Sequence, residues 1–341
     1  MFTDAECDYN NVIISVYKIY FKIMSVFVLG QWIVVLGVAL YALYKGTDIV
    51  LLGIKNVVKT HNVQSHYYGA VLMGMAAALP VLALSLAGVY IGHTSVVLPT
   101  VLGSVITILL LIGGVIACVG GSIVLWEDFL KTSLPVFCLS IVLFVIVIRD
   151  GMVDRLESVL LFSIFCIFVG YIYSVIKFGE VQPIQNRASK SISLSSLVYI
   201  VFGIVAILVG AKFSVDMSVN LATALSVSMP LVGISVLALG AILPTFILVL
   251  QALQRKDVTF ALGIIIGSSI CSVLLASSMA GLWAGNLAVG EVVTQLGVPV
   301  LICAAIIIFV SSLSRNFTRP VGLMMLTIFL FFLLNLAKFI G

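Results

Sequence analysis

Long apolar stretches, separated by short polar connections, occupy almost the whole chain. An α-helix needs roughly 20 apolar residues to cross a bilayer. Ten stretches come near that length, at about 25–52, 67–91, 98–125, 132–149, 156–178, 194–214, 227–253, 259–284, 294–313 and 319–339. They lack the polar–apolar alternation of transmembrane barrel strands. The pattern therefore predicts an all-α polytopic membrane protein with about ten transmembrane helices.

The composition indicates that the bilayer is the solvent. Of the 341 residues, 62% are hydrophobic and 9% are charged, whereas a soluble domain carries about 25% charged residues. The net charge of +4 is too small to indicate a nucleic-acid partner. Most cysteines lie inside apolar stretches, without metal-binding spacing. The expected partners are lipid and a transported solute, and we predict no cofactor, no metal site and no enzyme activity.

The longest polar stretch falls just past the middle of the chain, at 179–196. We interpret it as a linker, so the predicted organisation is an N-terminal segment (1–24), a five-helix repeat (25–178), a polar linker (179–193) and a second five-helix repeat (194–341). Ten Lys and Arg residues fall in the loops of one side and six at the other side. Cytoplasmic loops carry the excess, which predicts that both termini lie outside.

An internal repeat relates the two halves at a constant offset of 164 residues. Without any gap, Pro80 aligns with Pro244, and the Gly-Ser pair at 103–104 aligns with the pair at 267–268. Only eight prolines occur in the chain, so a match of two inside apolar stretches is informative. The offset covers five helices, an odd number, so the second copy is inverted in the membrane. Inverted repeats are typical of secondary transporters.

Each copy carries a helix-breaking motif. Proline in a helix interior removes a hydrogen bond and bends the chain, and the small residues around it let another helix come close. Carbonyl groups freed in this way can face a cavity. We predict that the breaks meet near the midplane, through Pro80, Pro244, Gly103 and Gly267.

Hydroxyl side chains follow the glycine of the next span in each copy. With the residue after the second proline, they form a candidate substrate or ion pathway of Ser104, Thr107, Thr245, Ser268, Ser269 and Ser272. The alternative is that these small residues serve helix packing alone, as they often do in membranes.

These motifs resemble the sodium/calcium exchanger (cation/Ca²⁺ antiporter) superfamily in its compact prokaryotic form. Segments 69–81 and 233–245 resemble the family repeat G-x-T-x-x-A-x-G-T-S-x-P-E, segment 263–272 resembles its later G-N-x-x-G-S-N-x-x-N run, and 99–106 does so more weakly. The resemblance covers roughly 27–340. It implies alternating access, with the first and sixth helices sliding over a core of the second, third, seventh and eighth, which hold a midplane site.

The family's calcium ligands are missing from this sequence. Val81 and Thr245 stand where the family has Glu, and the preceding Thr-Ser pair is replaced in both copies, at Ala77, Ala78, Ala241 and Ile242. Calcium takes about 6–8 oxygen ligands, usually with carboxylates among them, and a divalent ion without counter-charge is costly in mid-bilayer. Calcium transport is therefore not expected, whereas a cation such as Na⁺ is compatible with hydroxyl ligands.

Three hypotheses follow. The first is a secondary transporter of the antiporter family, whose short loops fit a bacterial plasma membrane. The second is a transport-inactive relative with a structural or partner-binding role. The third is a transporter of a monovalent cation or neutral solute on the same scaffold. A channel is disfavoured, because no segment resembles a selectivity filter.

Charged residues near the span ends form two helical pairs. Lys45 and Asp48 are three residues apart, and Lys212 and Asp216 are four apart, spacings that bring side chains together on a helix. We expect each pair to neutralise itself, with gating or proton coupling as the alternative. The segment 150–157, which resembles a family segment between the halves, is expected to be a salt-bridged turn.

Overall fold

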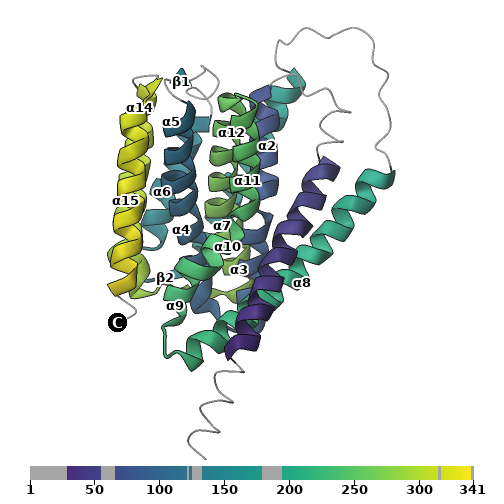
Figure 1. The fold of residues 1–341 in the computed structure, drawn as a ribbon, viewed down its shortest axis with the longest axis vertical. Coiled ribbons are helices and arrows are strands. Elements are labelled where there is room, and N and C mark those ends of the chain that lie inside the picture. The colour runs from purple at the N-terminus through teal and green to yellow at the C-terminus, as the bar shows by residue number, and fades with distance from the viewer. Residues whose placement is uncertain are drawn as a thin grey trace, which may run out of the picture.

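The computed structural model describes residues 29–54, 66–120, 123–124, 133–178, 194–313 and 316–338. The predicted N-terminal segment (1–24) and polar linker (179–193) lie outside these residues. The described chain forms a bundle of long helices that run roughly side by side (Figure 1).

The predicted membrane spans are present as helices. Within the described residues, eight are long and apolar enough to cross a bilayer: Leu29–Ile54, Ala70–Ile91, Thr94–Gly120, Arg155–Ser174, Ser196–Ala224, Val258–Ala284, Val293–Leu313 and Arg319–Lys338. A ninth is a bent pair, Met229–Ala241 with Leu243–Gln254. The shorter apolar helix α6 (Leu134–Val147) takes the place of the remaining predicted span. These helices confirm the all-α polytopic fold.

Short breaks divide the spans into smaller elements. After the helix Leu29–Ile54, the α-helices are α2 (His66–Ala77), α3 (Leu79–Ile91), α4 (Val97–Thr107), α5 (Gly113–Gly120), α6, α7 (Arg155–Phe178), α8 (Leu194–Ala224), α9 (Met229–Val232), α10 (Ala238–Ala241), α11 (Leu243–Gln254), α12 (Val258–Ile270), α13 (Ser277–Ala284), α14 (Val298–Leu313) and α15 (Arg319–Lys338). A 3-10 turn, η1 (Thr94–Val96), precedes α4. The π-helical turns are η2 (Ile108–Ile112), η4 (Gly233–Leu237), η5 (Cys271–Ala276) and η6 (Val293–Gly297).

The sixth span is longer than predicted. The predicted span ended at 214, whereas α8 continues to Ala224. A lysine near a span end can extend its amine toward the interface while its stem stays in the apolar layer. A charged residue near the end of an apolar run therefore does not mark the end of the helix.

Two small sheets tie the halves together and show the inverted repeat directly. Strand β1 (Ile123–Val124) pairs antiparallel with β4 (Asn316–Phe317), and β2 (Met152–Asp154) pairs with β3 (Asn286–Ala288). The registers are equivalent: Ile123 faces Phe317 in one sheet and, at the offset of 164, Leu287 faces Val153 in the other. The sheets lie at opposite ends of the bundle (Figure 1), as inversion requires.

The helix Leu29–Ile54 and α8 form a pair inclined to the other helices (Figure 1). Glycines make their contact close: a Cβ at Gly46 would lie 3.0 Å from the carbonyl oxygen of Gly203, and a Cβ at Gly210 would lie 2.9 Å from that of Ala39. Small residues at such interfaces let membrane helices approach along their backbones.

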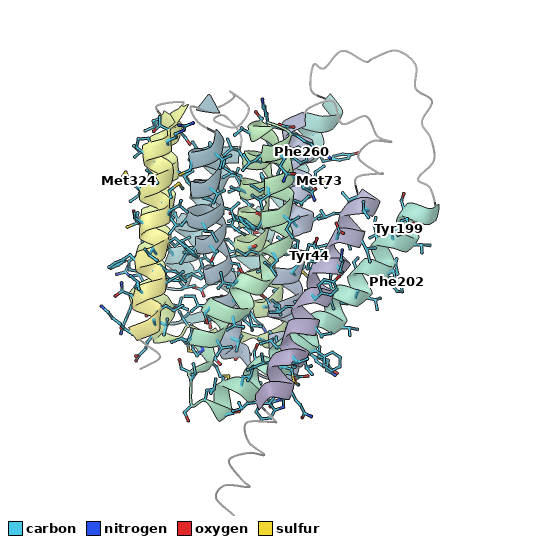
Figure 2. All side chains as sticks on the ribbon, in the orientation of Figure 1. Tyr44, Met73, Tyr199, Phe202, Phe260 and Met324 are labelled. Carbon is cyan, nitrogen blue, oxygen red and sulfur yellow. The ribbon has the colours of Figure 1, made fainter. Side chains whose placement is uncertain are left out.

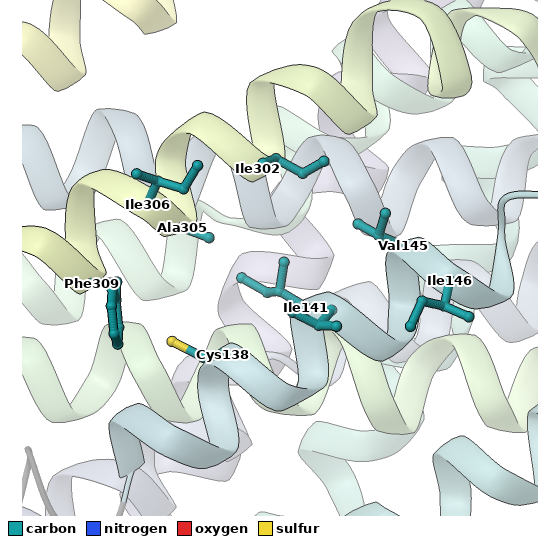
Figure 3. Close-up of a pocket in the computed structure, with 9 residues that line it drawn as sticks. Cys138, Ile141, Val145, Ile146, Ile302, Ala305, Ile306 and Phe309 are labelled. Atoms are coloured by element: carbon teal, nitrogen blue, oxygen red, sulfur yellow. The ribbon is translucent and has the colours of Figure 1, made fainter.

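The outer surface of the bundle is apolar, as lipid contact requires. Phe202 on α8 and Met324 on α15 point outward (Figure 2) and are 68% and 56% exposed. An apolar groove with a volume of about 410 Å³ lies between α6 and α14 and is lined by side chains such as Ile141, Ile306 and Phe309 (Figure 3). A soluble protein would hide such surfaces.

Candidate functional site

Both copies break their helix at the same point and in the same way. Ala78 has φ −83° and ψ −5°, and Ile242 has φ −86° and ψ −8°. A new helix starts at the next residue in each copy and carries its proline in the first turn. Proline is tolerated there because the first turn of a helix has no partner for its N–H groups. Each predicted proline thus lies two residues after a break. Gly103 and Gly267, which were assigned to the same helix-breaking motif, instead lie inside the continuous helices α4 and α12.

The two breaks differ in size. The span of the second copy is bent by 40° between Met229–Ala241 and Leu243–Gln254. The corresponding span of the first copy, Ala70–Ile91, is one continuous span of 22 residues. Each break is a single turn residue, Ala78 or Ile242, so the prediction of two broken helices needs a correction in the first copy, whose two segments stay straight enough to form one span. The second copy also has the π-helical turn η4 just before its break, and this extra irregularity accompanies its larger bend.

Glycines bring the four central spans into backbone contact. A Cβ at Gly267 would overlap the carbonyl oxygen of Val71, and a Cβ at Gly103 would overlap that of Ile234. These contacts join α12 to α2 and α4 to η4, in equivalent positions of the two copies. The Gly-Ser motifs therefore lie where spans of opposite halves cross, as predicted for a site between the second, third, seventh and eighth helices.

A hydrogen bond joins the two breaks. Thr245, in the first turn of α11, donates from Oγ1 to the carbonyl oxygen of Ala77 over 3.4 Å. Ala77 is the last residue of α2, before the break in the first copy, and Thr245 is 1% exposed. The structure thus brings the predicted helix-breaking motifs of both copies into direct contact.

Three of the predicted hydroxyls donate to their own helix. Ser104 bonds the carbonyl of Thr100 over 2.7 Å, Thr107 bonds that of Gly103 over 2.7 Å, and Ser268 bonds that of Ile265 over 3.0 Å. All three are at most 1% exposed. A hydroxyl that donates its proton in this way still has lone pairs with which to accept or coordinate.

Ser269 and Ser272 are different. Both are fully buried, and neither Oγ has a hydrogen-bond partner among the residues that the structure describes. A buried hydroxyl without a partner is costly, so these two mark a place where a polar guest would be stabilised. Ser214 and Ser218 on α8 share this state. Sequence reasoning missed that pair, although two hydroxyls four residues apart on an apolar helix were a usable signal.

The π-helical turns repeat as well. η2 starts at Ile108 and η5 at Cys271, so the two turns overlap at the offset of 164, immediately after the Gly-Ser motifs. A π-turn inserts a residue into the helical ladder and often marks a functional position. The sequence does not reveal these turns, because they depend on packing and not on composition.

Comparison with known proteins identifies this architecture. A family model described as "Sodium/calcium exchanger protein" matches the chain twice, over 31–174 and 195–338. The chain belongs to the sodium/calcium exchanger family. It is a multi-pass integral membrane protein of a secondary-transporter family.

Individual relatives agree with this membership. The chain is 26% identical over 309 residues to an uncharacterized membrane protein, MJ0091, of Methanocaldococcus jannaschii, covering 89% of this chain and 96% of that one. It is 30% identical over 111 residues to the sodium/calcium exchanger MaX1 of Methanosarcina acetivorans, covering 33% and 31%. A solved structure of the sodium–calcium exchanger NCX_Mj, soaked with Na⁺ and Sr²⁺, superposes with a TM-score of 0.66 at 24% identity, over 91% of this chain and 98% of that chain.

Compared with the family motif, the centre of this exchanger-family chain lacks carboxylates. The positions expected to lack ligands are all buried and at most 3% exposed: Ala77, Ala78, Val81, Ala241 and Ile242. Within the described residues, no group of three or more His, Cys, Asp or Glu side chains could hold a metal ion. Asp257 lies at a helix start, where its Oδ1 accepts from the Phe260 N–H.

Outside the centre, the predicted charge pairs had different outcomes. Lys45 and Asp48 form an exposed ion pair at 3.9 Å, which confirms that expectation. Lys212 instead lies over the ring of Tyr90, 5.8 Å from its centroid.

The turn at 150–157 is held by hydrogen bonds and not by the expected salt bridge. Glu157 accepts from the Asp154 N–H at 2.9 Å, and the Asp150 carboxylate accepts from the Met152 N–H at 3.4 Å. Glu157 thus caps the start of its own helix, α7, as the glutamate of a capping box does.

Proposed function

We propose that this chain is a secondary transporter whose central site takes a monovalent cation of the size of Na⁺ and does not take Ca²⁺. One observation carries the proposal: the buried oxygens where the four central spans cross are neutral hydroxyls and backbone carbonyls. The candidate ligands are Ser104, Thr107, Thr245, Ser268, Ser269 and Ser272.

The charge of the ion decides between Na⁺ and Ca²⁺. Transferring an ion into the low dielectric of the bilayer costs an energy that grows with the square of its charge, and carboxylates offset that cost at calcium sites. Val81 and Thr245 provide no such charge. Neutral oxygens and freed helix carbonyls are the groups that coordinate Na⁺ in transporters with broken helices.

The same scaffold supports alternating access. The helix Leu29–Ile54 and α8 contact each other through glycines, whereas the four central spans are joined by backbone contacts and by the bond from Thr245 to Ala77. In this proposal the inclined pair moves as a unit against this core.

The membrane and orientation belong to the same proposal. We place the protein in a bacterial plasma membrane with both termini outside, on the basis of the ten-to-six distribution of Lys and Arg. The start of helix Leu29–Ile54 and the end of α15 lie at the same end of the bundle (Figure 1), which is compatible with that orientation.

A transport-inactive role is the second candidate, and a specific observation favours it. Thr245 occupies the position of a family calcium ligand, but it donates to Ala77 across the two halves. A residue that ties the halves together would stabilise one state at the expense of exchange between two. Such a protein would act through its surface.

Ion flux in reconstituted vesicles separates these candidates. We expect an outward gradient of unlabelled Na⁺ to drive ²²Na⁺ uptake into vesicles that contain the protein, with no Na⁺-driven ⁴⁵Ca²⁺ uptake. Calcium uptake above that of empty vesicles would contradict the proposed ion selectivity. Absence of both fluxes, from protein that is monodisperse in detergent, would favour the inactive role.

A further inference from the structure

A second apolar groove lies against the first helix break. It has a volume of about 270 Å³ and separates α3 from α8, with walls of Leu79, Leu82, Ala83, Leu86, Ile204, Ile207 and Leu208. Every lining side chain is aliphatic. A groove of this kind on a membrane-spanning surface fits a hydrocarbon chain.

The groove leads to a cation and two aromatic rings. Tyr90 is one helical turn beyond Leu86 on α3, and Lys212 is one turn beyond Leu208 on α8, so each continues the lining face of its helix. The Lys212 Nζ lies 5.8 Å from the Tyr90 ring centroid, and the Tyr90 and Trp283 centroids are 6.3 Å apart. The apolar walls therefore end at a cluster with both charge and hydrogen-bonding capacity.

This cluster has the composition of a membrane interface. Tyr and Trp concentrate at the level of the lipid headgroups, and the two rings are 65% and 55% exposed. Lys212 lies beside Tyr90, which is near the end of α3, so its amine can reach the same level. Within the described residues, the structure gives Lys212 no ion pair. Its charge is therefore available to an anionic group from outside the chain.

We propose that an anionic phospholipid of the bilayer occupies this groove, with an acyl chain between α3 and α8 and its phosphate beside Lys212. The aliphatic walls bind the chain, and the ammonium group selects the negative headgroup. The lipid would lie between the broken span and α8. Movement of α8 along α3 would then require the chain to shift, so the lipid composition would influence that movement.

Photolabelling tests the proposal. The full-length protein is placed in phosphatidylcholine vesicles with a trace of phosphatidylglycerol that carries a diazirine on one acyl chain. After irradiation, labelled peptides are mapped by mass spectrometry. We expect label on α3 and α8 around the groove, and a drop of roughly fivefold in the K212Q variant, the factor for one basic residue near a membrane surface.

Controls separate the groove from general lipid contact. K338Q removes a basic residue near the end of α15, at the same end of the bundle, and should leave the label unchanged. L208W fills the mouth of the groove at a half-exposed position and should remove the label while Lys212 remains. Each variant is first checked for a monodisperse profile in detergent.

Two results would overturn the proposal. One is equal labelling by a phosphatidylcholine carrying the same diazirine. The other is undiminished label in both K212Q and L208W. Labelling requires no ion flux, so its outcome is independent of the proposed transport activity.

Discussion

The two halves of this protein share a backbone and differ in chemistry. The breaks at Ala78 and Ile242 have nearly the same dihedral angles, and the sheets pair in equivalent registers. The π-turns η2 and η5 overlap at the same offset. Features that depend on proline, glycine and main-chain hydrogen bonds therefore persist in both copies.

The polar side chains are unevenly distributed between the halves. In the first half, Ser104 and Thr107 both donate to their own helix, and Val81 follows the proline. In the second half, Ser269 and Ser272 have no hydrogen-bond partner within the described part of the chain, and Thr245 follows the proline. The second half also has the larger bend.

The comparison shows that scaffold and ligands are separable. Glycine and proline determine the helix crossings, so their loss would prevent folding. The ligand positions only need to fit the space between helices, so apolar residues can replace them without loss of the fold. Family membership therefore fixes the architecture of this chain and leaves its ion as a separate question.

The largest effects are expected where backbones touch. Valine at Gly267 or Gly103 would force a side chain into the carbonyl of Val71 or Ile234. Overpacking typically costs about 1–3 kcal/mol and occasionally more, and a backbone carbonyl can yield less than a flexible side chain. We expect both variants to be lost from the monodisperse fraction in detergent, to a similar degree, because the two contacts are equivalent.

Gly170 on α7 provides the matched control. Nothing lies within 4 Å of a Cβ built at this position, so G170A should keep its melting temperature or raise it slightly. A stable G267V beside an unstable G103V would show that the two crossings are not equivalent in solution.

The next effect concerns the buried hydroxyls and has opposite signs for stability and transport. S269A and S272A each remove a polar atom that has no partner, so we expect unchanged or higher thermal stability. If a hydroxyl contributes about 1.4 kcal/mol to the free energy of Na⁺ binding, its removal weakens the affinity for Na⁺ about tenfold. The measurement is the Na⁺ concentration for half-maximal ²²Na⁺ uptake in vesicles.

S104A is the comparison variant in the first half, because Ser104 is equally buried but donates to its own helix. It removes one intrahelical hydrogen bond and should lower the melting temperature slightly. If S104A and S272A change stability in the same direction, the unpartnered state of Ser272 is not a property of the folded protein in the membrane.

Most of the fold could be predicted from the sequence, because lipid leaves the chain few choices. An apolar run in a bilayer must satisfy its own backbone, so it becomes a helix. The positions of Pro80 and Pro244 then placed both breaks correctly. The predicted end of the sixth span was ten residues short of the end of α8, because the polar residues after 214 weaken the apolar run without ending the helix.

The contacts at the candidate site could not be predicted. The bond from Thr245 to Ala77 joins residues 168 positions apart, and its existence depends on how two bent spans cross. The π-helical turns could not be predicted either, because their amino-acid composition does not differ from that of the neighbouring α-helices. Ser214 and Ser218, which have no hydrogen-bond partner among the described residues, were not predicted. The candidate pathway was drawn from the proline and Gly-Ser motifs, and α8 contains neither motif.

The smallest effect tests the asymmetry at the prolines. T245V keeps the shape of the side chain and removes the bond to Ala77, whereas V81T adds a hydroxyl at the equivalent position of the first half. Hydrogen bonds between membrane helices contribute about 0.6 kcal/mol on average. We therefore expect T245V to lower the free energy of unfolding by about that amount, measured by denaturant titration in mixed micelles.

V81T should be close to neutral, because a threonine in the first turn of α3 can bond a carbonyl of the preceding turn. The Na⁺ affinity measured from ²²Na⁺ uptake then shows whether Thr245 only links the two halves or also binds the ion. If Thr245 only ties the halves, T245V loosens the core and leaves the Na⁺ affinity unchanged. If Thr245 also binds the ion, the affinity falls with the stability, and restoring the hydroxyl as T245S recovers both.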